Sequence, residues 1–134
     1  MDTNLLKIRE YRPDIDEHFI VKSFFEGLKF GHPYYKMIDD DAYFHWANNM
    51  IYGLLRDNSI QKDVCCLIED EEVIVGYSIY AFDILYWIYV KTRWRMMGIA
   101  KNLILDKNIK TVSTITKIGN ALRLKYNFKF NPFI

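Results

Sequence analysis

The chain has 134 residues and a formal net charge of +1, with 51% apolar and 16% aromatic residues. This length suits one domain with a sizeable core, and the composition excludes intrinsic disorder. The near-zero charge gives no general attraction to nucleic acid or an anionic membrane, so we expect neither as a partner. There is no apolar run long enough to span a bilayer and no signal-peptide pattern, so we expect a cytoplasmic protein.

The first half of the chain predicts one strand followed by two helices. Residues 6–11 read as a strand, and Asp14 and Glu17 have the spacing of a capping box that begins a helix. Apolar residues then recur at helical spacing as far as the break at residues 31–33. Three aspartates at 39–41 favour the start of a second amphipathic helix, because they interact well with its positive end.

The second half changes to a strand pattern. Adjacent Cys65 and Cys66 fall in an apolar run and would point to opposite faces of a strand, so we expect two packed thiols without a mutual disulfide, and no metal-binding spacing. The predicted elements are a hairpin over 64–82, a buried central strand over 85–90, a helix over 95–105, a strand over 111–116, a helix over 119–126 and a strand over 128–134. The fold class is therefore α/β (α+β) with a mixed central sheet, in the order β-α-α-β-β-β-α-β-α-β.

The most informative segment runs from the central strand into a basic loop and a helix. A helix start offers backbone amides and a positive dipole end, which can hold a pyrophosphate. Gly98 and Ala100 would let an anion approach the backbone closely. An ordinary helix start with a packing glycine is the alternative, and a dinucleotide-binding strand–helix unit is excluded because the G-x-G-x-x-G pattern is missing.

Arg95, Gly98 and Ala100 match the R/Q-x-x-G-x-G/A pattern of the GNAT acetyltransferases, and Val90 stands five residues before the arginine as in that family. The chain resembles this family over nearly its whole length, as one domain over residues 1–134. The resemblance implies a site for acetyl-coenzyme A, with a fourth strand that bulges and diverges from the fifth. The pantetheine arm would bond to the backbone of the fourth strand and the loop would hold the phosphates. The implied binding residues are Ile88, Tyr89, Val90, Arg95, Met96, Met97, Gly98, Ile99, Ala100 and Lys101.

The catalytic residues match the family less well. Arg123 stands where the family has a tyrosine that protonates the departing thiolate, so Tyr126, nearly one turn later, is the candidate acid. Asp83 is the acidic residue nearest in sequence to the central strand and is the candidate base, although a turn role also explains it. His32 and His45 fall in the segment that walls the acceptor site in the family, and surface or packing roles explain both.

Two functions follow from the resemblance. The first is transfer of an acetyl group from acetyl-coenzyme A to an amine, on a small molecule or a protein, by direct attack on the thioester. The second is a catalytically degenerate domain that binds coenzyme A or a protein partner. The family ends in two strands and this chain supplies one, so we also predict a homodimer or a partner complex through the C-terminal strand.

Overall fold

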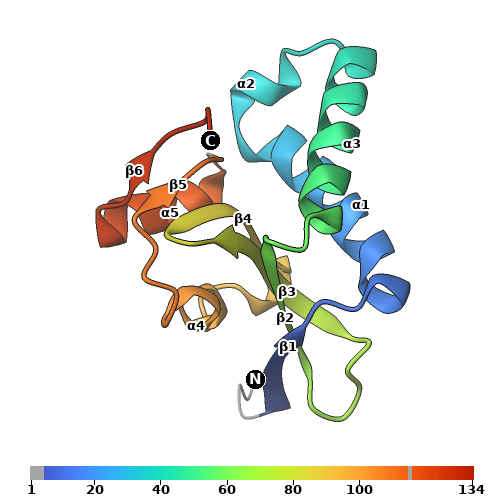
Figure 1. Ribbon diagram of the computed structural model, residues 1–134, viewed down its shortest axis with the longest axis vertical. Helices are drawn as coiled ribbons and strands as arrows, with labels where there is room; N and C mark the ends of the chain where they lie inside the picture. The colour runs from blue at the N-terminus through green and yellow to red at the C-terminus, as the bar shows by residue number, and fades with distance from the viewer. Residues whose placement is uncertain (1–4, 115) are drawn as a thin grey trace.

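The computed structural model describes residues 5–114 and 116–134, built around a six-stranded sheet in the order β1-β2-β3-β4-β5-β6 (Figure 1). The strands are β1 (Leu6–Glu10), β2 (Gln61–Leu67), β3 (Ile74–Ala81), β4 (Ile84–Val90), β5 (Thr111–Val112) and β6 (Lys129–Phe130). The helices are α1 (Pro13–Gly31), α2 (Pro33–Lys36), α3 (Asp40–Arg56), α4 (Ile99–Ile104) and α5 (Lys117–Tyr126). The strands from β1 to β4 are antiparallel neighbours, whereas β5 and β6 are added in parallel. The predicted mixed α/β fold is confirmed, with α2 as an additional helix.

The sheet separates two hydrophobic cores. On one face, α1 and α3 pack through Phe24, Leu28 and Ile51 against Tyr77 and Trp87 of the central strands. On the other face, α4 and α5 pack against the side chains of β3 and β4 that point the opposite way. Figure 1 shows these two groups of helices on either side of the sheet. Because successive residues of a strand point to opposite faces, the continuous apolar run of β4 serves both cores, as the sequence predicts.

The central strand β4 contains a bulge at Tyr86. Leu85 pairs with Tyr80 and Trp87 pairs with Ile79, so Tyr86 has no residue opposite it. The extra residue places Tyr86 and Trp87 in succession on the α1/α3 side of the sheet. A bulge bends its strand and interrupts pairing. On the other edge of β4, pairing with β5 stops at Leu85.

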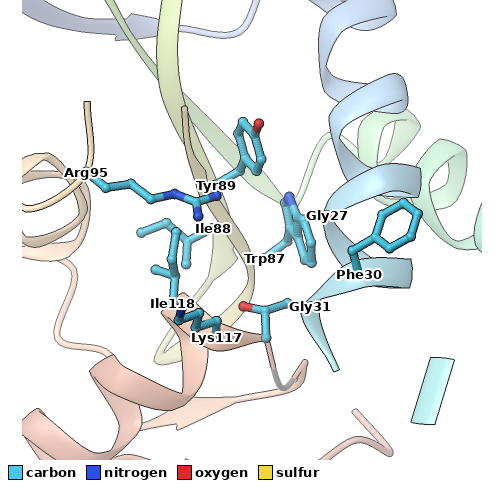
Figure 2. A pocket seen from close by; sticks show the side chains of 10 residues that line it. Gly27, Phe30, Gly31, Trp87, Ile88, Tyr89, Arg95, Lys117 and Ile118 are labelled. Atoms are coloured by element: carbon cyan, nitrogen blue, oxygen red, sulfur yellow. The ribbon is translucent and has the colours of Figure 1, made fainter. Parts of the chain in front are cut away.

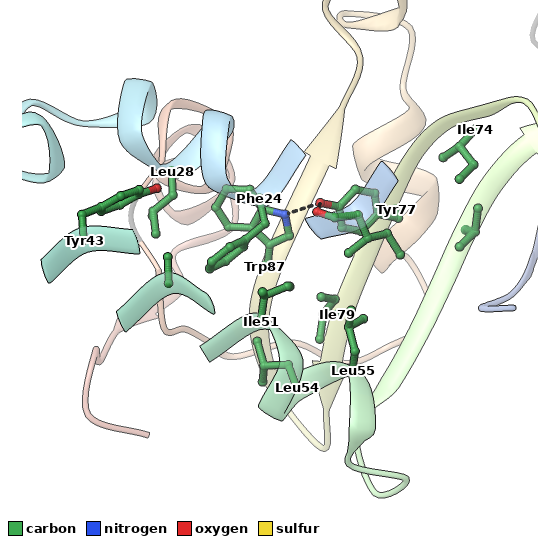
Figure 3. Close-up of a cluster of buried hydrophobic side chains, with 13 residues drawn as sticks. Phe24, Leu28, Tyr43, Ile51, Leu54, Leu55, Ile74, Tyr77, Ile79 and Trp87 are labelled. Atoms are coloured by element: carbon green, nitrogen blue, oxygen red, sulfur yellow. Dashed lines mark hydrogen bonds between the residues drawn. The ribbon is translucent and has the colours of Figure 1, made fainter. Parts of the chain in front are cut away.

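A buried hydrogen-bond network joins α1 to the central strands. The Tyr77 hydroxyl accepts from Trp87 Nε1 at 2.9 Å, donates to the Ile20 carbonyl at 3.1 Å and lies 2.7 Å from Ser23 Oγ. Figure 3 shows the Trp87–Tyr77 bond inside the core. Burial raises the pKa of the Tyr77 phenol, which therefore stays a neutral hydroxyl and keeps these bonds.

Two helix starts differ from the prediction. The helix α1 begins at Pro13, one residue before the expected cap, and Asp16 rather than Glu17 accepts the backbone N–H of Arg12 at 2.7 Å. The expected capping box is therefore wrong. The helix predicted over 95–105 begins only at Ile99, after a 3₁₀ turn at Thr92–Trp94. Gly98 has a φ of 79°, a left-handed conformation that ends any continuous helix through it.

The C-terminal segment pairs differently from the expectation. The expected strand over 128–134 is limited to β6, and β6 lies directly beside β5 in parallel. One strand thus follows β5, as expected, and β6 is the last strand of the sheet in the described residues. Short edge strands are one way in which proteins avoid recruiting other strands, so this pairing weakens the reason for expecting a second molecule. The homodimer stays a prediction.

Two further expectations concern the cysteines and the membrane. Cys65 and Cys66 are both free and buried. Burial raises the pKa of the Cys65 thiol to about 11, so it is protonated at neutral pH. Among the helices of the described residues, none combines the length and the apolar character needed to cross a bilayer.

A buried ion pair fixes α1 to β1. Both carboxylate oxygens of the fully buried Asp16 accept from the Arg9 guanidinium at 2.7 Å. The substitution Asp16→Asn would remove the charge that balances Arg9, so it should lower the free energy of unfolding by about 3 kcal/mol in urea denaturation. The value stands at the low end of such losses because Arg9 keeps its bonds to the Glu71 carbonyl.

The exposed pair between Lys29 and Asp40 gives the matched control, since their atoms also lie within hydrogen-bond distance at 2.9 Å. Asp40→Asn should leave the denaturation midpoint nearly unchanged, because solvent screens an exposed pair. Equal effects of the two substitutions would contradict the assignment of Asp16 as a structural anchor.

Candidate active site

The divergence of β4 from β5 leaves backbone groups of β4 without a neighbouring strand. The N–H of Lys91 bonds to Val75 on the β3 side, and backbone groups alternate in direction along a strand. The N–H and C=O groups of Ile88 and Val90 therefore face the opposite side, toward β5. The last backbone–backbone bond from the β5 segment to β4 runs from the Ser113 N–H to the Leu85 carbonyl, before either residue is reached.

A cavity of about 170 Å³ opens beside these groups, and we call it the strand cavity. Trp87, Ile88 and Tyr89 line it from β4, and the end of α1 lines it opposite (Figure 2). The full lining is Gly27, Phe30, Gly31, Trp87, Ile88, Tyr89, Arg95, Thr116, Lys117 and Ile118. A Cβ on Gly27 would lie 3.2 Å from the Trp87 ring, so this glycine allows α1 and β4 to approach closely around the cavity.

The loop before α4 lines a second cavity of about 540 Å³, which we call the loop cavity. From the loop and α4 it is lined by Val90, Thr92, Trp94, Arg95, Met96, Gly98, Ile99, Ala100 and Lys101, and from α5 by Lys117, Ile118, Ala121, Leu122, Lys125 and Tyr126. The strand and loop cavities adjoin, because Arg95, Lys117 and Ile118 line both.

Basic side chains surround the loop cavity. Lys101, Lys117 and Lys125 are exposed along its walls, and Arg95 lies at its junction with the strand cavity. No carboxylate contributes to the lining of either cavity among the described residues. This arrangement gives the loop cavity a local positive potential that the net charge of +1 does not reveal.

Arg95 is turned back along β4. Its Nε donates to the Val90 carbonyl at 2.8 Å, and its guanidinium carbon lies 5.9 Å from the centre of the Tyr89 ring. Figure 2 shows this side chain extending from the loop toward Tyr89. The carbonyl of Val90 is therefore occupied, whereas the backbone of Ile88 has no partner on the β5 side among the described residues.

The structure brings most of the predicted binding residues to these two cavities. Ile88 and Tyr89 line the strand cavity, Arg95 lines both, and the others except Met97 line the loop cavity. Met97 packs instead against the core beneath α4 and α5. The late start of α4 means that the residues from Arg95 to Gly98 form a turn and present no helix-start amides, contrary to the expectation.

The two predicted catalytic residues lie apart from the strand cavity. Asp83 precedes β4 at the end remote from Val90, where its carbonyl accepts from Lys110 and Thr111, and it lines neither of the two cavities. Trp87 stands four positions further along the strand, a rise of roughly 13 Å. Tyr126 lines the loop cavity, but its hydroxyl is buried and has no hydrogen-bond partner among the described residues.

Sequence reasoning missed the contribution of α5 and of the end of α1. Lys117, Ala121 and Lys125 recur every four residues, which places them on one face of α5, and this spacing was the available signal. Phe30 and Gly31 carried no such signal, because their role depends on where α1 ends against the start of α5. A Cβ on Gly31 would lie 3.3 Å from Thr116 Cβ.

Comparison with solved structures shows which fold the chain has. No protein-family model and no curated protein matches the sequence. Among solved structures, an acetyltransferase of the GNAT family from Staphylococcus aureus Mu50 aligns with a TM-score of 0.57 and 20% identity over 91% of this chain and 81% of that one. AAC(6')-Iy, in complex with the bisubstrate analogue CoA-S-monomethyl-acetylneamine, aligns with a TM-score of 0.51 and 18% identity over 92% and 90% of the two chains. A transcriptional regulator from Bacillus halodurans C-125 aligns with a TM-score of 0.56 and 15% identity over 91% of this chain and 90% of that one.

These similarities confirm the resemblance at the level of the fold: the chain has the fold of the GNAT acetyltransferases. The bulged β4 and its early separation from β5 are the features that the resemblance implied, and both are present. At 15–20% sequence identity these comparisons show the fold alone, so the activity has to be argued from the residues of the site.

Gly98 provides a first test of the loop. Its positive φ disfavours any residue with a side chain, although a Cβ there would meet nothing within 4 Å. Gly98→Ala should therefore lower the free energy of unfolding by about 1 kcal/mol, and Gly98→Asn by less, because asparagine tolerates the left-handed conformation.

Gly53 in α3 is the control, since a Cβ there also meets nothing within 4 Å but the helical backbone suits alanine. Gly53→Ala should raise stability by up to about 1 kcal/mol. Urea denaturation measures all three variants, and equal stability of Gly98→Ala and wild type would contradict the left-handed turn.

Proposed function

We propose that the chain is an N-acetyltransferase that binds acetyl-coenzyme A across the strand and loop cavities and transfers the acetyl group to an amine. The observation that carries this proposal is the adjacency of the two cavities. One lies beside the backbone of Ile88, which has no partner on the β5 side among the described residues, and the other is ringed by basic side chains. A long molecule with an amide-bearing arm and a phosphate-bearing end matches both environments.

The residues present fit this cosubstrate. The outward N–H and C=O of Ile88 can bond to the amides of a pantetheine arm as a further strand would. At Gly98 the open space on the Cβ side lets a phosphate come near the backbone, and Lys101, Lys117 and Lys125 supply positive charge around it. The full set proposed to bind is Ile88, Tyr89, Val90, Arg95, Met96, Gly98, Ile99, Ala100 and Lys101, with Lys117 and Lys125 added from α5.

Acetyl-coenzyme A supplies a thioester whose carbonyl carbon an amine can attack. The amine nitrogen forms a bond to that carbon while the carbon–sulfur bond breaks, and the amine gives up a proton as the departing sulfur takes one. The protein's contribution is positioning: Trp87 is held by its bond to Tyr77, and the walls of β4, α1 and α5 restrict how the two reactants meet.

The proton is accepted by water in this proposal. Among the described residues, the strand cavity has neither a carboxylate nor a histidine in its lining, and Asp83 lies at the far end of β4. A route through water requires no side chain with a tuned pKa. Neither Asp83 nor Tyr126 is assigned a proton-transfer role.

Binding of coenzyme A is the first test of the proposal. Coenzyme A at millimolar concentration should raise the melting temperature by mass action. Lys125→Gln should weaken binding in calorimetry by roughly 3- to 10-fold, or about 0.7–1.4 kcal/mol, because it removes one charge facing the phosphates.

Lys129→Gln is the matched control, since Lys129 is also an exposed lysine near the C-terminus but lines neither the strand cavity nor the loop cavity. It should bind as the wild type does. A wild-type protein that gives no heat and no thermal shift with coenzyme A would overturn the proposed function.

Tyr126→Phe tests the remaining candidate acid. Because the Tyr126 hydroxyl is buried without a partner among the described residues, its removal should leave turnover unchanged and slightly raise stability. A thiol-release assay with saturating amine measures the turnover. A large fall in turnover with unchanged affinity for coenzyme A would instead identify Tyr126 as the proton donor predicted from the sequence.

The alternative is a degenerate domain that binds coenzyme A without turnover. The arginine at position 123 favours it, since its guanidinium bonds to Asn120 and offers no acid for the thiolate. A chain that binds coenzyme A but releases no free thiol with any amine of a broad panel would establish this alternative.

A further inference from the structure

A third cavity, of about 830 Å³, adjoins the strand cavity on the side away from the basic loop. Phe30, Gly31, Thr116 and Lys117 line both cavities, so the third is the direct continuation of the strand cavity. Its full lining is Phe30, Gly31, His32, Tyr34, Tyr35, Thr116, Lys117, Asn120, Phe130, Pro132 and Phe133, and we call it the aromatic cavity. Figure 1 shows the C-terminal segment reaching toward α2, where two of these walls meet.

The rings in this lining come from three separate segments. Phe30 lies at the end of α1, Tyr34 and Tyr35 belong to α2, and Phe130 and Phe133 belong to the C-terminal segment. The side chains of Phe30, Tyr34 and Phe133 are 67%, 62% and 92% exposed. Large aromatic residues that stay exposed around one hollow, rather than packing in a core, are typical of a ligand-binding surface.

The charge of the aromatic cavity restricts its ligand. Its described lining has no Asp or Glu and one lysine, Lys117. The Nδ1 of His32 accepts from the Tyr34 N–H at 3.2 Å. A ligand with several ammonium groups would find no counter-charge here and would be repelled by Lys117.

We propose that the aromatic cavity receives the amine acceptor. This acceptor is a primary alkylamine that carries an aromatic ring and has no second positive charge. This inference rests on the proposed acetyl transfer. The aromatic ring lies among Phe30, Tyr34 and Phe133, and the amine points along the shared wall into the strand cavity. There the neutral nitrogen forms its bond to the acetyl carbon as the carbon–sulfur bond breaks; the proton goes to water, and the released sulfur is protonated.

Direct binding of 2-phenylethylamine, measured by calorimetry with and without coenzyme A, tests the inference. We expect saturable binding of 2-phenylethylamine and none of spermidine, which matches it as an amine but carries additional positive charges. Phe133→Ala should weaken the binding of 2-phenylethylamine roughly 2- to 10-fold, the effect of losing one aromatic contact. Its affinity for coenzyme A should stay that of the wild type.

Phe82→Ala is the matched control for Phe133→Ala. Phe82 is 88% exposed, in the turn between β3 and β4, and it lines none of the three cavities. This variant should bind 2-phenylethylamine as the wild type does. Because both substitutions remove one exposed phenyl group, a difference between them reports on the cavity rather than on surface hydrophobicity.

The two proposals fail in different measurements. If coenzyme A binds but 2-phenylethylamine does not, or if spermidine binds as well or better, the aromatic-acceptor inference is overturned while the proposed function stands. If Phe133→Ala and Phe82→Ala weaken amine binding equally, the inference is also overturned. If coenzyme A fails to bind, the proposed function falls whatever the amine does.

Discussion

The site depends on a single extra residue in β4. Tyr86 is the extra residue between Leu85 and Trp87 in the pairing of β4 with β3, and on the other edge of β4 the pairing with β5 ends at Leu85. The bulge thus bends β4 just where the pairing with β5 stops. The cost is a set of backbone groups at Ile88 that have no strand partner within residues 5–114 and 116–134, and buried groups of this kind require some other partner. In the proposed function, an extended ligand bound beside β4 is that partner.

The bulge also determines what faces that cavity from the α1 side. It places Trp87 on the same face as the hydroxyl of Tyr77, and their hydrogen bond fixes the indole ring. The same hydroxyl is bonded to Ile20 and lies beside Ser23, so α1 is held to the sheet at this point. About two turns further along, α1 contributes its last residues to the cavity walls. Each such bond contributes about 1 kcal/mol, and their arrangement around one buried atom makes the wall rigid.

The sequence was sufficient for the elements whose signal is local. The hairpin of β2 and β3, the buried run of β4 and the helices α1, α3 and α5 all follow from periodicity and turn residues. The start of α4 was mistaken because Met96 and Met97 are good helix formers, whereas the left-handed turn at Gly98 is a property of the folded loop. The α1 cap was mistaken because Asp16 is engaged by Arg9 from another element, which no local pattern reveals.

The same distinction applies to the site. Gly98, Ala100 and Lys101, which line the loop cavity, could be found from sequence because the loop and the start of α4 are one continuous segment. The aromatic cavity is assembled from the end of α1, α2 and the C-terminal segment, so its residues are neighbours only after the chain has folded. Asp83 was favoured for its closeness in sequence to β4, but a strand moves its ends apart, and a residue at the start of β4 cannot reach groups near its other end.

Lys117 links the electrostatics of the three cavities, since it lines all of them. On the loop side it adds to the charge of Lys101 and Lys125, which suits phosphates. In the described lining of the aromatic cavity no carboxylate balances the charge of Lys117, which disfavours binding of a ligand with a second positive charge. In the proposed function, one ammonium group thus favours an anionic cosubstrate at one end of the site and discriminates against polycationic acceptors at the other. Because the acceptor amine of the proposed reaction must lose its own charge before it attacks, a nearby lysine would also favour the neutral, reactive form of that amine.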